Sequence, residues 1–225
     1  MTAQPPFLAR LLHKGRSVLD PRGALRAAFS RHYQENGWGE AETVSGPGST
    51  LERTADIRRA LPALVAELGV RTLLDAGCGD FHWFQTLSIP LERYIGTEVV
   101  PELAAANQAR FGNPERQFLA LDVTRDRLPQ VDLILCRDCL VHLKNGQVRA
   151  ALRNFAQSGA RYLLATTFTD DRENRDIPLG GWRPLNLERP PFSLPPPLRR
   201  ISERQSVEDE RYTDKSLALW ELRAR

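Results

Sequence analysis

The stretch Leu73-Leu74-Asp75-Ala76-Gly77-Cys78-Gly79 decides the fold of this chain. The apolar residues from Val70 to Leu74 predict a short buried strand that ends in an Asp-x-Gly-x-Gly turn. Glycines at such a turn let the backbone approach a ligand closely and leave amide groups exposed. A strand, a glycine turn and a following helix over 81–87 are typical of an open α/β sheet, in which ligands bind beyond the carboxyl ends of the strands.

Strand and helix patterns alternate on both sides of this turn. Ser49 and Glu52 predict a capping box at the start of a helix that ends at Gly69, with a kink or restart at Pro62. Downstream, Pro101 predicts the start of a second helix, and a third ends at Gly159. Further strands are predicted at 93–98, 117–122, 131–136 and 162–167. This alternation predicts a parallel sheet covered by helices on both faces.

The two ends of the chain depart from this alternation. Residues 1–48 predict an N-terminal helical segment, broken near Pro21, followed by a glycine-rich loop. Residues 49–225 predict the main domain, which contains a proline-rich loop at 169–197. Two strand patterns then follow at 198–201 and 217–222 without a clear helix between them, so we expect them to pair as an antiparallel hairpin.

Acidic residues stand at the predicted ends of later strands. Glu98 follows the second strand, 19 residues after Gly79, a spacing suited to binding ribose hydroxyl groups. Asp122 follows the third strand, and Cys136-Arg137-Asp138 follows the fourth. Each feature alone suits an ordinary βα turn or a solvated carboxylate. Their common register predicts one ligand site at the carboxyl edge of the sheet.

These four segments resemble the motifs of the class I S-adenosylmethionine (SAM)-dependent methyltransferases over residues 70–168. The resemblance implies a three-layer, Rossmann-like α/β fold with a mostly parallel seven-stranded sheet and a C-terminal antiparallel hairpin. It implies SAM as the cofactor, with Asp75, Gly77, Cys78 and Gly79 near its methionine part. It also implies Glu98 at the ribose, and Asp122 with Val123 beside the adenine. Two positions depart from the family pattern: Phe81 stands where many members have a third glycine, and Glu98 replaces the commoner aspartate.

Residues after the fourth strand are candidates for acid–base chemistry. Asp138 and His142 are the candidate catalytic residues, because a hydroxyl or ammonium acceptor must lose a proton during methyl transfer. The alternative for His142 is a capping or packing role in the following helix. Arg137 is a candidate partner for a carboxylate, including that of the SAM methionine.

The proline-rich loop contains Gly180-Gly181-Trp182-Arg183, with Asn186 three residues further on. Trp182, Arg183 and Asn186 are candidate acceptor-binding residues, since they offer a stacking face and hydrogen-bond donors. The alternative is a surface loop anchored by a buried Trp182. Trp38 and residues 46–50 are candidates for the opposing wall. No metal is expected, although Asp170, Asp171 and Asn174 offer oxygen ligands as an alternative.

Composition limits the class of protein. The net charge is +3 and the pI is about 9.0, with a basic excess in residues 1–32 that leaves RNA open as a partner. Three cysteines are too few for a disulfide framework, and Cys136-x-x-Cys139 lacks a second pair for zinc. The sequence has no apolar run long enough to span a membrane and no secretory signal pattern, so a cytoplasmic location is expected.

The sequence therefore predicts a SAM-dependent methyltransferase acting on an oxygen or nitrogen atom of a small-molecule or saccharide-like acceptor. An RNA methyltransferase and a non-catalytic methyltransferase-like module are alternatives. An NAD-dependent oxidoreductase is a further alternative, but its fingerprint requires a glycine where His82 stands.

Overall fold

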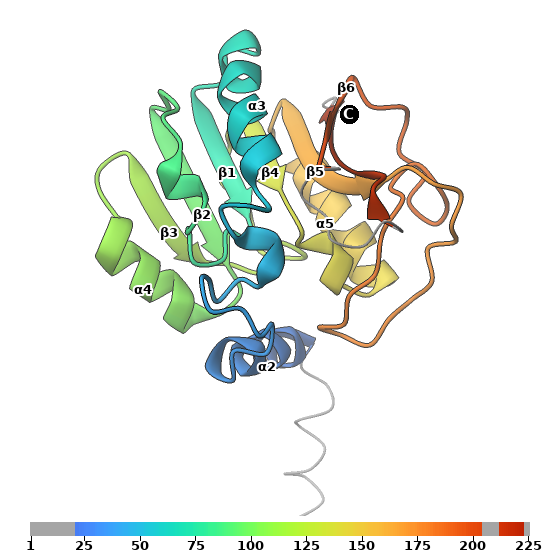
Figure 1. The fold of residues 1–225 in the computed structure, drawn as a ribbon, viewed down its shortest axis with the longest axis horizontal. Coiled ribbons are helices and arrows are strands. Elements are labelled where there is room, and N and C mark those ends of the chain that lie inside the picture. Colours follow the sequence, from blue (N-terminus) through green and yellow to red (C-terminus); the bar gives the residue numbers. More distant parts are fainter. Residues whose placement is uncertain (1–20, 204–211, 223–225) are drawn as a thin grey trace, which may run out of the picture.

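The computed structural model describes residues 21–203 and 212–222, and seven strands within them form a single sheet (Figure 1). The strands are β1 (Thr72–Ala76), β2 (Arg93–Glu98), β3 (Arg116–Ala120), β4 (Leu133–Cys136), β5 (Tyr162–Phe168), β6 (Arg199–Ser202) and β7 (Lys215–Glu221). Their order in the sheet is β3-β2-β1-β4-β5-β7-β6. The first five are parallel, whereas β7 runs antiparallel to both β5 and β6. The predicted sheet and its terminal hairpin are confirmed.

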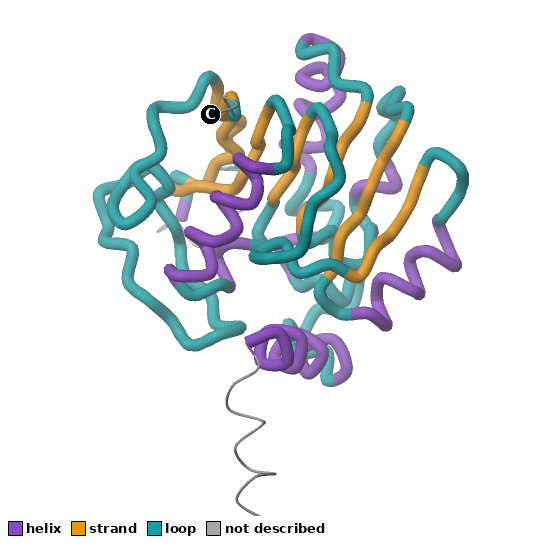
Figure 2. Tube along the Cα trace, turned by 180° about the vertical axis from the view of Figure 1, so that it is seen from behind, coloured by secondary structure: helices purple, strands orange, loops and turns teal. Residues whose placement is uncertain are grey.

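Helices cover both faces of the sheet and create two apolar cores (Figures 1 and 2). The helices on the faces are α3 (Ala55–Glu67), α4 (Pro101–Phe111) and α5 (Asn145–Gln157), whereas α2 (Pro21–Gln34) lies at the edge of the sheet. On one face, α3 packs Ile57 and Leu61 against β1 and β4. On the other, α5 packs Val148 and Phe155 against the same strands. Every residue of β4 and β5 is buried, which explains why these strands are continuous apolar runs.

Helix α3 starts later than the capping-box pattern predicted. The side chain of Thr50 accepts a hydrogen bond from the Arg53 amide, and the Leu51 amide donates to Glu42. These bonds hold residues 51–54 in turns, so Ala55 is the first helical residue and the expected start at Ser49 is wrong. The helix continues through Pro62, because the residues around it are buried in the core.

The helix predicted over 81–87 is also wrong. Only a short 3₁₀ turn, Phe84–Thr86, forms between β1 and β2. Phe81 adopts a left-handed backbone conformation with φ of 60° and is only 1% exposed. Its ring lies within 5.0–5.6 Å of the rings of Phe84, Tyr94, Phe111 and Phe118. Burial of this ring directs the chain into the core and replaces the expected helix.

Helix α2 lies across the edge of the sheet where the parallel strands end (Figure 1). The chain from 35 to 54 then returns over the same edge before α3 begins. The loop after β5 passes around the outside of α5, and its backbone returns to the sheet where the Phe168 amide donates to the Leu185 carbonyl. Among the described residues, no helix combines the length and apolar character needed to cross a bilayer.

We predict that Phe81→Ala lowers the free energy of unfolding by about 3–5 kcal/mol, because it empties the centre of the aromatic cluster. Urea denaturation of the full chain measures this change. Leu198→Ala is the matched control, since Leu198 is 63% exposed and its loss should change stability by less than about 0.5 kcal/mol. Similar unfolding midpoints for the two variants would contradict the structural role of Phe81.

Candidate active site

The glycine turn after β1 brings bare backbone to the carboxyl edge of the sheet. Gly77 and Gly79 have φ values of 81° and 57°, in the left-handed region that favours glycine. The amides of Gly77 and Cys78 both donate to the carbonyl of Thr97, 3.0 Å away. A Cβ on Gly77 would lie 3.0 Å from Cys139, and one on Gly79 would lie 2.1 Å from Ser45 Oγ. Only glycine therefore fits at these two positions.

Glu98 ends β2 beside the turn. Its carboxylate accepts hydrogen bonds from the amides of Val99 at 2.8 Å and Gly79 at 3.3 Å, with a longer one from Val100. Burial raises the pKa of Glu98 and these amides oppose the rise. The carboxylate thus lies next to the glycine backbone, as the sequence predicted.

A first cavity opens beside Glu98 and is bounded by apolar residues of α2. Asp122 lies across it, with its carboxylate accepting from the amide and hydroxyl of Thr124 and paired with Arg125 at 3.2 Å. Val123 lies next to Asp122 in the wall. Leu25, Phe29 and Tyr33 of α2 line the opposite side. The cavity is a mainly apolar slot with one carboxylate at each of two strand ends.

A second cavity adjoins the first at the glycine turn. Six residues line both cavities: Trp38, Ser45, Gly77, Gly79, Asp138 and His142. The second is also lined by Asp75, Cys78 and Arg137, and by Trp182. The structure therefore brings the candidate cofactor residues and the two candidate catalytic residues to two adjoining cavities.

Asp75 lies under the turn and carries an unusual carboxyl group. Its side chain accepts a hydrogen bond from the Tyr94 hydroxyl at 2.9 Å. Burial raises the pKa of Asp75 to about 7, the Tyr94 hydrogen bond opposes this, and the nearby Glu98 adds to it. Asp75 therefore holds its proton to a higher pH than an ordinary aspartate.

A buried charge cluster joins the segment after β4 to the terminal hairpin. Arg137 contacts Glu203 through Nη2 at 2.5 Å and Nε at 3.0 Å, and it also donates to the Gly48 carbonyl. Lys215 donates to Asp138 at 2.6 Å and lies 3.6 Å from Glu203. Most of the Arg137 donors are thus bound within the protein. Glu203 and Lys215 were not predicted, although Lys215 is a charged residue at the start of an apolar strand.

Asp138 is held as an anion. Its pKa falls to about 2, because the favourable charges of Lys215 and Arg137 outweigh the effect of burial. Its backbone is left-handed, with φ of 49°, and its amide donates to the Thr166 hydroxyl at 2.9 Å. A carboxylate with so low a pKa is a weak proton acceptor near neutral pH.

His142 lies where the two cavities meet. Its Nδ1 is 2.8 Å from the Gly181 carbonyl oxygen, which can only accept, so Nδ1 carries the proton and Nε2 has the lone pair. Burial lowers the pKa of His142, against the opposing effects of the Gly181 hydrogen bond and the Asp138 charge. Trp38 packs against the ring with centroids 4.5 Å apart. The imidazole is therefore neutral and oriented.

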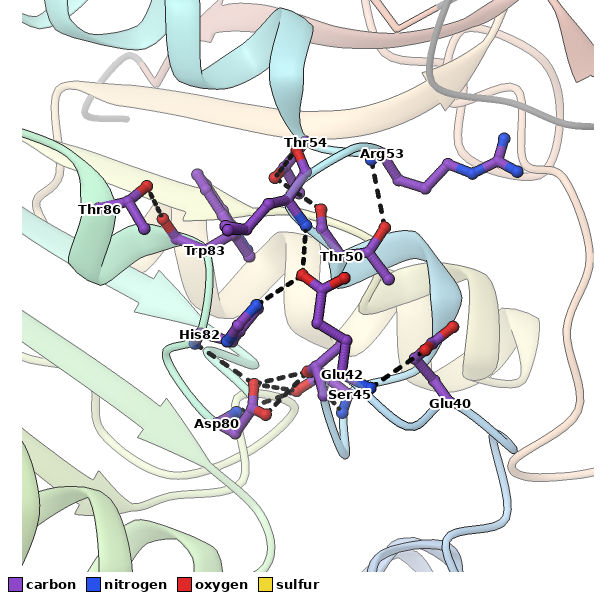
Figure 3. Close-up of polar contacts among 12 residues, drawn as sticks. Glu40, Glu42, Ser45, Thr50, Arg53, Thr54, Asp80, His82, Trp83 and Thr86 are labelled. Atoms are coloured by element: carbon purple, nitrogen blue, oxygen red, sulfur yellow. Dashed lines mark hydrogen bonds and ion pairs between the residues drawn. The ribbon is translucent and has the colours of Figure 1, made fainter.

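Hydrogen bonds join the segment before α3 to Asp80, which directly follows the glycine turn (Figure 3). The sequence did not predict these contacts. Asp80 accepts hydrogen bonds from the hydroxyls of Thr43 and Ser45 at 2.8–2.9 Å and from the Val44 amide at 3.1 Å. The Asp80 amide in turn donates to Ser45 Oγ. A polar run facing an acid 35 to 37 residues away gives no periodic signal, so only the structure shows this pairing.

A second pair secures the same segment. His82 Nε2 lies 2.7 Å from Glu42, whose carboxylate also accepts from the Leu51 amide at 2.7 Å (Figure 3). We call Glu42, Thr43, Ser45, Asp80 and His82 the latch. The latch holds Trp38 and residues 46–49 as the opposing wall of the second cavity, where the sequence had placed candidates for it.

The loop after β5 is only partly as predicted. Trp182 lines the second cavity and is 43% exposed. Arg183 instead donates to the Val141 carbonyl and to Asn145, and Asn186 donates to the Asp170 carbonyl. Both are buried and hold the loop to the protein, so their expected contact with an acceptor is corrected to a structural role.

The alternative metal ligands and the cysteines have other surroundings. Asp170 pairs with Arg172, Asp171 pairs with Arg189, and Asn174 binds the loop backbone. No cluster of three or more potential ligands occurs in the part of the chain that the structure describes. Within that part, all three cysteines are free thiols, and burial raises the pKa of Cys78.

The basic N-terminal excess is only partly described. Arg26 and Arg31 are exposed on α2, whereas Arg10, Lys14 and Arg16 lie outside the described residues. The face of α2 that bears Leu25 and Phe29 lines the first cavity.

Comparisons with known proteins support the fold. No protein-family profile matches the sequence, and no curated protein is significantly similar to it. Magnesium protoporphyrin IX methyltransferase (ChlM) from Synechocystis PCC 6803, solved with bound SAM, superimposes with a TM-score of 0.59. It is 13% identical, over 91% of this chain and 98% of that one. The [4+2]-cyclase SpnF superimposes with a TM-score of 0.52 and 19% identity, over 73% of this chain and 78% of that one.

The chain thus has the class I SAM-dependent methyltransferase fold. One of the two similar structures is described as a cyclase, so the fold alone does not define the reaction.

We predict that Asp80→Ala speeds amide hydrogen exchange in residues 43–51 by roughly 30-fold. The variant removes several hydrogen bonds, and a local loss of about 2 kcal/mol corresponds to that factor. Asp171→Ala is the control, because it removes a carboxylate from an exposed ion pair in another loop. Unchanged exchange in residues 43–51 would show that the latch does not stabilise this segment.

For His142 we predict a neutral ring at pH 7, with the proton on Nδ1 and a pKa below the usual value for histidine. Nitrogen-15 NMR of the imidazole distinguishes the two tautomers, and a pH titration gives the pKa. His142→Gln identifies the signal. Protonation of the ring at pH 7, or a proton on Nε2, would contradict the orientation described above.

Proposed function

We propose that this chain, with its class I methyltransferase fold, is a SAM-dependent methyltransferase acting on an oxygen or nitrogen atom of a small-molecule or saccharide-like acceptor. The observation that carries the proposal is a pair of adjoining cavities: the Glu98 and Asp122 carboxylates line the first, Trp182 and Lys215 line the second, and His142 lines both. The first suits a nucleoside and the second suits an acceptor.

The residues of the first cavity fit the adenosine part of SAM. Glu98 is a half-buried carboxylate next to the glycine backbone, where it can accept hydrogen bonds from a ribose diol. Asp122 and Val123 offer an acceptor oxygen and an apolar surface to the adenine. The methionine part then extends past Gly77, Gly79 and Cys78 towards Asp75.

The chemistry requires little beyond alignment. When bound, SAM would supply an electrophilic methyl group on a sulfonium: the acceptor lone pair forms a bond to the methyl carbon, and the carbon–sulfur electron pair leaves with sulfur in S-adenosylhomocysteine (SAH). The protein holds the acceptor in line and removes its proton.

Of the two candidate bases, His142 is better suited. Its Nε2 lone pair is not used by the Gly181 hydrogen bond, its side chain lines both cavities, and its lowered pKa keeps it unprotonated at neutral pH. Asp138, with a pKa of about 2, acts instead as a fixed anion that stabilises the imidazolium formed when His142 takes a proton. Arg137, with most of its donors bound to Glu203 and Gly48, positions Asp138 more than it contacts the cofactor.

The sheet order argues against the oxidoreductase alternative. Nicotinamide-binding sheets have the order 3-2-1-4-5-6, whereas here an antiparallel strand, β7, is inserted between β5 and β6. His82, at the third glycine position of that fingerprint, is bound to Glu42 in the latch.

We predict that SAM binds the protein and that Glu98→Ala weakens binding by about 1–3 kcal/mol, the loss expected for hydrogen bonds to a charged group. Isothermal titration calorimetry measures the affinity, with NAD(H) as the control ligand. Glu102→Ala is the matched control variant, since Glu102 is exposed on α4. Binding of NAD(H) without SAM, or of neither, would refute the proposed function.

A further inference from the structure

One part of the second cavity is an aromatic wall, formed by Phe168, Trp182 and Tyr212. The rings of Trp182 and Tyr212 meet edge to face with centroids 5.0 Å apart, and Phe168 lies 6.1 Å from Trp182 and 6.2 Å from Tyr212. Arg172 lies 5.7 Å from the Phe168 ring and 5.4 Å from the Tyr212 ring, and it pairs with Asp214. The wall is therefore held in place before any ligand arrives.

Trp182 is the exposed residue of this wall. Within the described residues, it and Leu198 are the large apolar side chains that remain exposed. Leu198 lies on the outer surface next to β6, whereas Trp182 lines the cavity. A large aromatic side chain left exposed inside a cavity offers a stacking surface to a flat ligand.

Polar side chains in the same loop are turned away from the cavity. Asn174, Arg183 and Asn186 are 4–7% exposed, and each is bound to the protein backbone. This loop therefore presents the flat face of Trp182 to the cavity, whereas polar groups of the lining, such as Asp138 and Lys215, come from other segments.

Lys215 supplies a cation to the lining of the same cavity. Its ammonium carries three N–H groups, and it has two carboxylate partners, Asp138 at 2.6 Å and Glu203 at 3.6 Å. Lys215 is the first residue of β7, and Tyr212 of the wall lies three residues before it in the chain. A carboxylate on a ligand that lies against Trp182 can complete this set.

We propose that the acceptor is an aromatic acid: a flat ring that stacks on Trp182 and Tyr212, with a carboxylate directed to Lys215 and a hydroxyl or amino group directed to His142. This inference rests on the proposed function and specifies its acceptor. It narrows the acceptor from small molecules in general and replaces the saccharide-like alternative.

Calorimetry on the full chain saturated with SAH tests the proposal, because SAH fills the cofactor site without turnover. The probes are benzoic and naphthoic acids that carry a hydroxyl or amino group, their uncharged methyl esters, glucuronate and methyl glucoside. We expect members of the aromatic acid set to bind at least about tenfold more tightly than their esters, as for loss of a charge-assisted hydrogen bond. Glucuronate, which has a carboxylate but no aromatic ring, should bind at least as weakly as the esters.

Variants assign the contacts. Trp182→Ala should weaken the aromatic acids about tenfold, the scale of an aromatic contact together with its buried area. Lys215→Gln should abolish the preference for acid over ester, and Lys215→Arg, which keeps the charge, should retain it. Leu198→Ala is the matched control for Trp182→Ala and should leave all affinities unchanged. Trp182→Ala and Leu198→Ala should leave the SAH affinity unchanged, and the two Lys215 variants are compared by their preference for acid over ester at saturating SAH.

The outcomes separate the two proposals. Failure of SAH to bind refutes the proposed function itself. Normal SAH binding with no binding of any aromatic acid, or with glucuronate or methyl glucoside bound more tightly, overturns the aromatic-acid proposal alone. Binding of aromatic acids that is insensitive to both Trp182→Ala and Lys215→Gln overturns the assignment of this wall.

Discussion

The buried charge cluster of Arg137, Asp138, Glu203 and Lys215 is the constraint on which the site depends. Glu203 is fully buried and the two cations are almost so, and removing one partner from such a cluster leaves an uncompensated charge at a cost of several kcal/mol. Two of the members follow β4 and the other two belong to the β6–β7 hairpin. The hairpin therefore cannot shift along the sheet edge without separating buried opposite charges. This fixes Asp138 and Lys215 on one wall of the cavity.

The glycine turn imposes a second constraint, because it leaves space over its backbone. Residues of the latch fill part of that space. A turn without side chains leaves open space over the backbone, and Ser45 occupies the part above Gly79. Asp80, directly after the turn, binds Ser45 and Thr43. The segment before α3 thus becomes a wall of the site, although it precedes the glycine turn by more than 30 residues in the sequence. The same absence of side chains that allows a ligand to approach also allows this segment to close over it.

The sequence predicted those features that depend on local patterns. Buried strands show apolar runs, so the sheet could be predicted. The fixed spacing of glycines and of strand-end acids such as Glu98 and Asp122 placed the candidate cofactor residues at one edge of it. Two helix predictions failed because tertiary contacts outweighed local ones: Phe81 entered the aromatic core, and Glu42 held the turn before α3. Lys215, Glu203 and the latch could not be predicted, since pairs of charges distant in sequence leave no periodic trace. Arg183 and Asn186 were assigned to the wrong surroundings, because residue type does not show which way a loop side chain points.

The loop after β5 links acceptor recognition to proton removal. Its Trp182 forms the stacking face, while the carbonyl of the preceding Gly181 fixes the proton on Nδ1 of His142 and so leaves Nε2 free to accept. Arg183, next in the chain, binds the carbonyl of Val141, the residue before His142. Three consecutive loop residues therefore connect the acceptor wall, the tautomer of the base and the backbone that carries it. A displacement of this loop would therefore disturb acceptor binding and the orientation of His142 together. The hydrogen bonds of its polar residues to the protein oppose such a displacement.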